Sequence, residues 1–335
     1  MVVLVTGVTG FLGGVTAKYL IDEKGYQPNE IRFLARNKSK SKEFLDLGLE
    51  MFFGDLAQPE TLKGIMKDVT DVYHNAAIVI NEAVPEDMMY RINHTGTMTL
   101  AKEFLKSEST TKFNFASTFG AYGFKFPKYP VPESFTLQPK NAYQKSKVKA
   151  EQDLLIKQNE QDLDVTIYRY PLILGPRDTL TSFRLCQGLL NEKVVYMGKG
   201  ENQFSMIDAR DGARAMNAGT KNSKSKGQIY NIKSFDITQN DYFGFYADAL
   251  GITKTLRRYP KWLLMSLAWF TEMTTPKDKE VLITRTRVNR YSEVRLTDDS
   301  KIRKELGFQP KYSDAKQVIN ESVNWLQKQK LIRNN

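Results

Sequence analysis

A glycine-rich turn close to the N-terminus constrains the fold of this chain more than any other feature. An apolar run at residues 2–5 is followed by Thr6-Gly7-Val8-Thr9-Gly10-Phe11-Leu12-Gly13-Gly14, and apolar residues then recur at helical spacing. Glycines let a ligand approach the backbone, and a helix N-terminus attracts phosphate. The pattern predicts a strand, a turn and a helix that cradle a pyrophosphate. Alternatively, the glycines serve only close packing of the strand and helix. The expected ligand contacts are Thr6, Gly7, Thr9, Gly10, Phe11, Leu12 and Gly13.

Strands and helices alternate along the first half of the chain. Further strands are predicted at 31–35, 50–53, 71–77, 113–116 and 165–170, with helices at 86–106 and 142–159 between them. Such alternation is typical of an α/β fold with a doubly wound parallel sheet, the Rossmann arrangement.

The second half is less regular and predicts a smaller C-terminal lobe that binds substrate. We expect the dinucleotide-binding domain at 1–175, rejoined by 205–233, and the lobe at 176–204 and 234–335.

Composition narrows the functional classes. The chain has 335 residues, 49 basic and 38 acidic, for a net charge of +11, but the basic residues are scattered without interleaved base-stacking aromatics. We therefore expect a solvated basic surface and no nucleic-acid partner. The single Cys186 forms no intrachain disulfide and has no neighbouring metal ligands, so no metal site is expected. With no visible signal sequence, the expected location is cytoplasmic.

The residues that follow the later strands predict which dinucleotide binds. Asp55 and Leu56 follow the third strand, and Asn75-Ala76-Ala77 ends the fourth, where they could border the ligand at the carboxyl edge of the sheet. Arg36 follows the second strand, with Lys38 nearby, where a carboxylate would favour NAD. These cations favour the 2′-phosphate of NADP, although NAD stays possible and both could belong to a solvated loop.

Tyr143 and Lys147 stand four residues apart on a predicted helix and therefore share a face. A nearby ammonium group lowers the pKa of a tyrosine, which suits proton transfer. The same spacing also arises by chance. Thr118, and in competition Ser117, close the fifth strand at the same sheet edge, where a hydroxyl could bond a substrate carbonyl; either could instead bond local backbone.

Together these motifs resemble the extended short-chain dehydrogenases/reductases of the NAD-dependent epimerase/dehydratase superfamily. The turn reads T-G-x-x-G-x-x-G, the helix carries Y-x-x-x-K, and Thr118 stands 25 residues before Tyr143. The resemblance implies that Thr118, Tyr143 and Lys147 are catalytic and that Asn93 holds a water or a backbone carbonyl in a proton relay. It also implies that both Tyr143 and Lys147 contact the cofactor. The strand end Tyr170-Pro171 is expected at the cofactor as well. A homodimer formed by helices 86–106 and 142–159 is implied too.

Residues that depart from the family pattern indicate which of the family's reactions to expect. Phe119-Gly120 stand where dehydratases place Asp-Glu, and the diphosphate anchors of many sugar-nucleotide enzymes are missing near residues 170–172 and 204–208. The chain is more similar to the dihydroflavonol reductase and 3β-hydroxysteroid dehydrogenase branch. This implies hydride transfer between a nicotinamide and a ketone or secondary alcohol of a fairly apolar small molecule. A sugar-nucleotide epimerase and a non-catalytic dinucleotide sensor are the alternatives.

One apolar run, residues 260–270, is too short to span a bilayer. It is interpreted as a buried lid, a subunit contact or a peripheral membrane contact.

Overall fold

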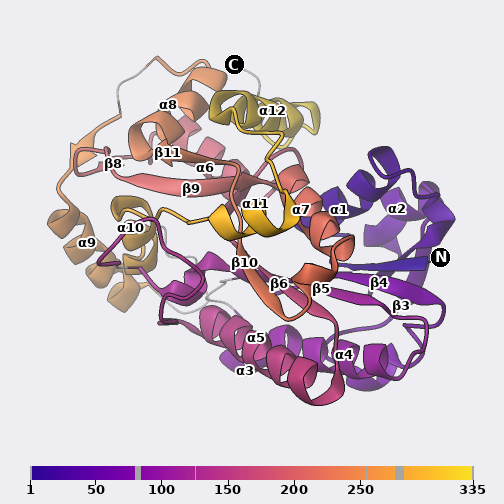
Figure 1. The fold of residues 1–335 in the computed structure, drawn as a ribbon. Coiled ribbons are helices and arrows are strands. Elements are labelled where there is room, and N and C mark those ends of the chain that lie inside the picture. Colours follow the sequence, from indigo (N-terminus) through magenta and orange to yellow (C-terminus); the bar gives the residue numbers. More distant parts are fainter. Residues whose placement is uncertain (1, 80–83, 125, 254–255, 276–282, 334–335) are drawn as a thin grey trace.

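A computed structural model describes residues 2–79, 84–124, 126–253, 256–275 and 283–333. Within them, parallel strands form one large sheet of order β10-β6-β5-β4-β1-β2-β3 (Figure 1). The strands are β1 (Val2–Thr6), β2 (Ile31–Ala35), β3 (Glu50–Phe53), β4 (Val69–His74), β5 (Lys112–Thr118), β6 (Val165–Tyr170) and β10 (Gln228–Asn231). The predicted doubly wound sheet is confirmed, and the chain returns to it through β10 at one edge.

Helices cover both faces of this sheet (Figure 1). One face carries α1 (Phe11–Asp22) and α7 (Ala209–Thr220), and the other carries α4 (Thr97–Leu105) and α5 (Ala142–Gln161). Because both faces are buried, β1 and β6 are apolar or enclosed along nearly their whole length rather than alternating. The sheet is thereby fixed as a rigid platform whose strand ends can position a site. Between β2 and β3 the chain forms the short helix α2 (Lys42–Asp46).

The predicted helix at 86–106 is interrupted. It consists of α3 (Glu86–Tyr90), a π-helical turn at Arg91–Gly96, and α4. At Gly96 a side chain is excluded, because a Cβ there would lie 2.7 Å from Leu56. Such π-helical turns occur often at functional sites, and this one carries Asn93.

A second, smaller lobe is built around its own core. Its sheet has the order β11-β9-β7, from β7 (Leu172–Leu174), β9 (Gln203–Asp208) and β11 (Phe235–Thr238), and β8 (Tyr196–Met197) pairs with β12 (Arg258–Tyr259). Helices α6 (Thr181–Leu190), α8 (Gln239–Ala249) and α12 (Ala315–Lys328) pack around a shared apolar cluster. The remaining helices are α9 (Lys261–Thr274), α10 (Arg285–Ser292) and α11 (Ser300–Leu306).

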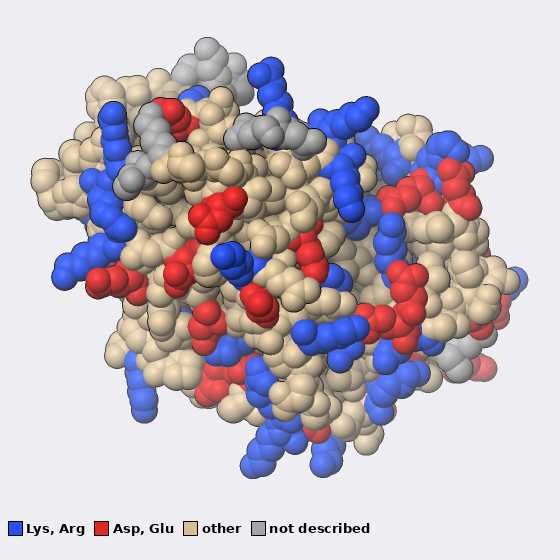
Figure 2. Space-filling model, turned by 90° about the horizontal axis from the view of Figure 1, so that it is seen from above, with Lys and Arg blue, Asp and Glu red and all other residues tan. Residues whose placement is uncertain are grey.

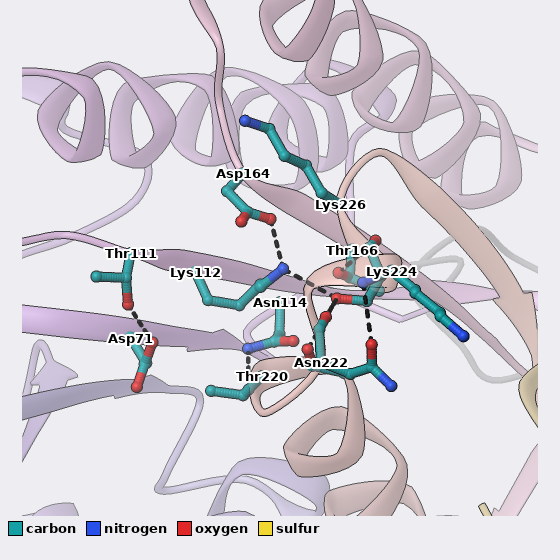
Figure 3. Close-up of polar contacts among 12 residues, drawn as sticks. Asp71, Thr111, Lys112, Asn114, Asp164, Thr166, Thr220, Asn222, Lys224 and Lys226 are labelled. Atoms are coloured by element: carbon teal, nitrogen blue, oxygen red, sulfur yellow. Dashed lines mark hydrogen bonds and ion pairs between the residues drawn. The ribbon is translucent and has the colours of Figure 1, made fainter. Parts of the chain in front are cut away.

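A buried polar cluster joins the amino ends of the central strands to the segment that follows α7 (Figure 3). The Lys112 ammonium donates to Asp164 at 2.5 Å and to Ser225 at 2.9 Å. Asn114 donates to the Thr220 hydroxyl at 2.8 Å. These bonds stabilise the edge of the sheet opposite to the one where the strands end.

The molecular surface is charged but mixed. On the face shown in Figure 2, Lys and Arg side chains are interspersed with Asp and Glu. Among the helices that the structure describes, none is long and apolar enough to cross a bilayer.

Candidate active site

The glycine turn brings β1, α1 and the end of β4 into close contact. Gly7 has φ +76°, and a Cβ there would lie 2.9 Å from the Ala76 nitrogen. A Cβ at Gly13 would lie 2.4 Å from the Gly7 carbonyl carbon and oxygen. Glycine is therefore required at both positions, and the alternative of strand–helix packing describes part of what these residues do. The structure also leaves Thr9 and Gly10 exposed.

The N-terminus of α1 faces this turn with free donors. Its N-cap residue is Gly10, and no side chain of the described residues caps it. The first N–H groups of a helix without a cap can donate to an anion, and the helix dipole favours negative charge there. Phe11 and Leu12, the first residues of the helix, are half-buried. The strand, the glycine turn and the helix predicted from sequence are present, and the pyrophosphate site itself stays a prediction.

Hydrogen bonds hold the start of the segment after β4 against the turn. The Thr6 hydroxyl accepts from the Ala76 N–H at 3.0 Å and bonds His74 Nδ1 at 2.7 Å. Asn75 donates to Thr16 at 3.2 Å, but its buried Oδ1 has no hydrogen-bond partner among the described residues. A buried acceptor without a partner is costly, so Asn75 is suited to receive a donor from a bound ligand. Ala77 is half-buried beside it.

A cavity of about 350 Å³ opens between the glycine turn and the end of β2. It is lined by Thr9, Ala35, Arg36, Asn37 and Lys40. Arg36 is 67% exposed and lies 3.4 Å from Asp55 Oδ2. Lys38 is not among the lining residues; the second cation is Lys40, which a 3₁₀ turn at Ser39–Ser41 brings back toward the strand end. Sequence spacing alone did not indicate this turn.

Of three further residues expected at the cofactor, Asp55 faces Arg36, whereas the side chains of Leu56 and Tyr170 are buried in the core. The Asp55 carboxylate accepts from the Ala57 N–H at 2.9 Å and faces Arg36. The Leu56 side chain is buried in the core next to Gly96. The Tyr170 hydroxyl donates to the Gly212 carbonyl at 3.0 Å inside the core, so only the backbone of Tyr170 faces the strand end, beside the half-buried Pro171.

Thr118 ends β5, where its hydroxyl accepts from the backbone N–H of Gly120 at 3.0 Å, and α5, which carries Tyr143, packs against this strand. Tyr143 lies in the first turn of α5, where Asn141 caps the helix by accepting from the Gln144 N–H at 3.0 Å. Burial raises the pKa of Tyr143, while a hydrogen bond with Thr118 and the positive charge of Arg290 lower it. Ser117, the competing hydroxyl, is 4% exposed and bonds Glu151 instead. The geometry therefore favours Thr118 over Ser117.

Lys147 is 2% exposed one helical turn after Tyr143. Its Nζ lies 3.8 Å from the centre of the Phe115 ring, a cation–π contact. Burial lowers the pKa of Lys147 to about 7, and the charge of Glu151 opposes this shift. The Lys147 ammonium lies against Phe115, and Arg290 of α10 is a cation that lowers the pKa of Tyr143.

Asn93 clamps the backbone that follows β4. Its Oδ1 accepts from the Ile78 N–H at 2.8 Å, and its Nδ2 donates to the Ile78 carbonyl at 2.9 Å and to Ser146 at 3.2 Å. Ser146 in turn donates to the Tyr143 carbonyl at 2.8 Å. Asn93 therefore joins the strand end to the first turn of α5.

A buried ion pair behind this site was not anticipated from sequence. Arg169 of β6 and Glu151 of α5 are 2% and 1% exposed, and the Arg169 Nη2 donates to Glu151 at 2.6 Å. Arg169 also donates to the Tyr122 hydroxyl at 2.6 Å. Glu151 follows Lys147 by one helical turn, so this pair fixes the charge environment of the lysine. The four-residue spacing of Lys147 and Glu151 was the one available signal.

Comparison with known proteins places the chain in a family. Residues 3–232 match the model of the NAD dependent epimerase/dehydratase family. The chain belongs to this family. Its members are nicotinamide-dependent enzymes, so the resemblance to extended short-chain dehydrogenases/reductases is confirmed.

Relatives within this epimerase/dehydratase family differ in their reactions. The chain is 23% identical to "Sterol demethylase protein B" of Methylococcus capsulatus, over 99% of this chain and 100% of that protein. It is 29% identical to the "2-alkyl-3-oxoalkanoate reductase" of Stenotrophomonas maltophilia, over 61% of this chain and 60% of that protein. The structure of UDP-glucose 4-epimerase from Thermotoga maritima has the same fold, with a TM-score of 0.79 and 23% identity over 98% of this chain and 100% of that one.

The residues present fit the nicotinamide dinucleotide on which the epimerase/dehydratase family depends. The cradle excludes a Cβ at Gly7 and Gly13, the end of α1 offers free donors, and Asn75 offers a buried acceptor. Arg36 and Lys40 line a cavity next to this turn. All of these groups lie at the carboxyl ends of parallel strands, where ligands bind in open α/β sheets.

Proposed function

We propose that this protein is an NADP-preferring oxidoreductase that interconverts a ketone and a secondary alcohol in a fairly apolar small molecule. The observation that carries the proposal is the packing of α5 against β5, which brings Tyr143 in the first turn of α5 into contact with the end of β5, where Thr118 lies. The two residues come from different elements and lie at the sheet edge that also holds the glycine cradle. A reacting oxygen placed between them would receive one hydrogen bond from each.

The proposed roles follow from this contact. When bound, the dinucleotide supplies or accepts the hydride at the nicotinamide ring. In reduction, Tyr143 donates its proton to the carbonyl oxygen while Thr118 donates a hydrogen bond to it; in oxidation, Tyr143 accepts the proton from the alcohol. Lys147 and Asn93 are proposed to hold this region in place, Lys147 through its contact with the Phe115 ring and Asn93 through Ile78 and Ser146.

The preference for NADP rests on the cavity at the end of β2. Arg36 can donate two parallel hydrogen bonds to a phosphate, and Lys40 adds a second positive charge. The carboxylate of Asp55 lies 3.4 Å from the Arg36 guanidinium, which offsets its negative charge. A ribose 2′-phosphate would therefore meet a net positive site.

An apolar substrate is supported by what lies around Thr118 and on β9. Phe119, Tyr122 and Phe126 form an aromatic cluster directly after Thr118. On β9, where many sugar-nucleotide enzymes hold a diphosphate, Phe204 and Met206 are buried in the core of the smaller lobe. The sterol-related name of one relative agrees with an apolar substrate class.

The test is a screen of apolar ketones with NADPH, and of the corresponding alcohols with NADP, monitored by nicotinamide absorbance. Tyr143→Phe should abolish turnover and leave NADPH affinity within about twofold, because a general acid contributes about 10²–10⁴-fold to the rate. Unchanged turnover in that variant would refute the assignment.

Epimerisation of a sugar nucleotide is the second candidate, since the chain shares its fold with a UDP-glucose 4-epimerase. An epimerase would show no net NADPH oxidation and would convert a nucleotide sugar into its C4 epimer. A non-catalytic sensor would instead bind NADPH and leave every ketone and nucleotide sugar unchanged. The three outcomes are distinguishable in one set of incubations.

A further inference from the structure

Helix α9 of the smaller lobe presents an unusual surface. Six of the 13 large apolar side chains exposed in the described part of the chain lie on this one helix of 14 residues. Trp262 is 69% exposed, Met273 67% and Phe270 58%. The other three are Leu263, Leu267 and Trp269. Contiguous apolar surface of this kind marks an interaction site.

The helix has two distinct faces. Leu264 and Ala268 are buried against Val288 of α10 and form a small core of their own. At 100° per residue, the six exposed apolar side chains share the opposite arc of roughly 160°. Figure 1 shows α9 and α10 at the outer end of the smaller lobe, far from the edge strand β3.

The two polar side chains on the exposed arc already form hydrogen bonds within the helix. The Ser266 hydroxyl donates to the Trp262 carbonyl at 3.1 Å, and the Thr274 hydroxyl donates to the Phe270 carbonyl at 2.9 Å. Within the arc, the side chains are otherwise apolar. Such a face can enter an apolar medium without leaving these hydroxyl protons unbonded.

The borders of the helix are basic. Among the described residues between 257 and 293, six are basic and two are acidic, although one of the six, Arg290, acts on Tyr143 at the candidate site. Arg257 and Arg258 are exposed just before the helix. Of the acidic residues, Glu272 accepts from Arg285 at 2.5 Å, and Glu293 is paired with Lys261. The helix therefore combines an apolar face with a positively charged border.

We propose that α9 lies in the interface of an anionic lipid bilayer and attaches the protein to it peripherally. The helix is about 21 Å long at 1.5 Å per residue, too short for an apolar core of about 30 Å. Tryptophan favours the headgroup region, and the basic border attracts anionic lipids. These are the properties of an interfacial amphipathic helix.

A second copy of the chain is a poorer match for this face. A twofold interface brings the same surface of each subunit together, which would set one basic border against the other. An anionic bilayer offers the opposite charge. The charge around α9 therefore favours lipid over self-association.

Vesicle binding of the full-length chain tests the proposal. We expect co-sedimentation with phosphatidylcholine vesicles that contain 30% phosphatidylglycerol, and at least about tenfold weaker binding to pure phosphatidylcholine or in 0.5 M salt. The double variant Trp269→Glu/Phe270→Glu should bind at least about tenfold more weakly. The matched control is Phe53→Glu, which changes a side chain that is 70% exposed on β3, and its binding should be unchanged.

Quenching of tryptophan fluorescence by brominated lipid provides a second readout that does not add charge to α9. The chain has three tryptophans, Trp262, Trp269 and Trp325. The first two should be quenched, so the double variant Trp262→Phe/Trp269→Phe should lose nearly all quenching. Persistent quenching through Trp325 alone would overturn the assignment to α9.

Two further results would also overturn the proposal. One is equal vesicle binding by the α9 and β3 glutamate variants. The other is a change of molar mass in solution from dimer to monomer in the Trp269→Glu/Phe270→Glu variant, without vesicle binding by the native chain. Both measurements are made without turnover, so their outcome is independent of the proposed oxidoreductase activity.

Discussion

The contact between the glycine turn and α1 can be tested by adding a single methyl group. In Gly13→Ala the new Cβ would lie 2.4 Å from the Gly7 carbonyl carbon and oxygen and 2.7 Å from the Thr6 carbonyl oxygen. All three are main-chain atoms, so no side-chain rotation relieves the overlap. The approach is about 1 Å closer than an ordinary van der Waals contact.

Two opposing effects set the size of the change. Alanine in a helix is favoured over glycine by about 1 kcal/mol, whereas overpacking costs about 1–3 kcal/mol. Because the contacts at Gly13 are with rigid backbone, we expect the upper end of the cost and a net destabilisation of about 2 kcal/mol. For a chain of this length that corresponds to a Tm lower by roughly 3 °C.

Gly244→Ala is the matched control. It makes the same exchange inside helix α8, where an added Cβ meets no atom within 4 Å. Its Tm should rise by roughly 1.5 °C. Calorimetry and NADPH titration of both variants complete the assay: affinity should fall at least about tenfold in Gly13→Ala and stay unchanged in Gly244→Ala. Equal stability and native affinity in both variants would show that the turn and helix are not packed as described.

Three further outcomes are expected. Arg36→Ala should weaken NADPH binding by about 10–100-fold and leave NADH unaffected, while Lys38→Ala should change neither titration, because Lys38 lies outside the cavity. Glu151→Leu should destabilise the fold by about 3–5 kcal/mol in urea unfolding, and adding Arg169→Met should restore most of the loss, since a lone buried charge costs more than none. Arg290→Met removes a charge that lowers the pKa of Tyr143, so that pKa rises and the alkaline limb of ketone reduction, where Tyr143 loses the proton it is proposed to donate, moves to higher pH; an unmoved limb would contradict this.

The large sheet was predictable because its strands are short apolar runs separated by helical periodicity. The strands at 31–35, 50–53 and 165–170 agree with the structure to the residue. The smaller lobe was expected from sequence, but the strands of its sheet were not, because β7, β9 and β11 contain only three to six residues each and pair with partners distant in sequence. Such pairing depends on tertiary packing rather than on local pattern. The π-helical turn at Arg91–Gly96 was hidden for a similar reason, since its apolar residues continue the helical spacing.

The site was predictable in residue type but not in detail. Ser117 and Thr118 are neighbours on a strand, so their side chains point to opposite faces, and only the packing of α5 determines which one meets Tyr143. Lys40 lines the cavity and Lys38 does not, and this difference depends on the 3₁₀ turn at Ser39–Ser41. Burial also decides the pKa of Lys147, and burial cannot be derived from the four-residue spacing alone.

Buried polar groups lie at both edges of the large sheet, and one at the amino edge, the Arg32 Nε, lacks a hydrogen-bond partner among the described residues. At the amino edge, Lys112 and Asn114 each have partners within the protein. At the carboxyl edge, the Asn75 Oδ1 lacks a partner among the described residues, and the first N–H groups of α1 have no side-chain cap there. Buried polar groups are normally satisfied, because each one left unbonded costs about 1–3 kcal/mol. A ligand at the carboxyl edge would complete both the Asn75 Oδ1 and the first N–H groups of α1, and the same edge holds Tyr143.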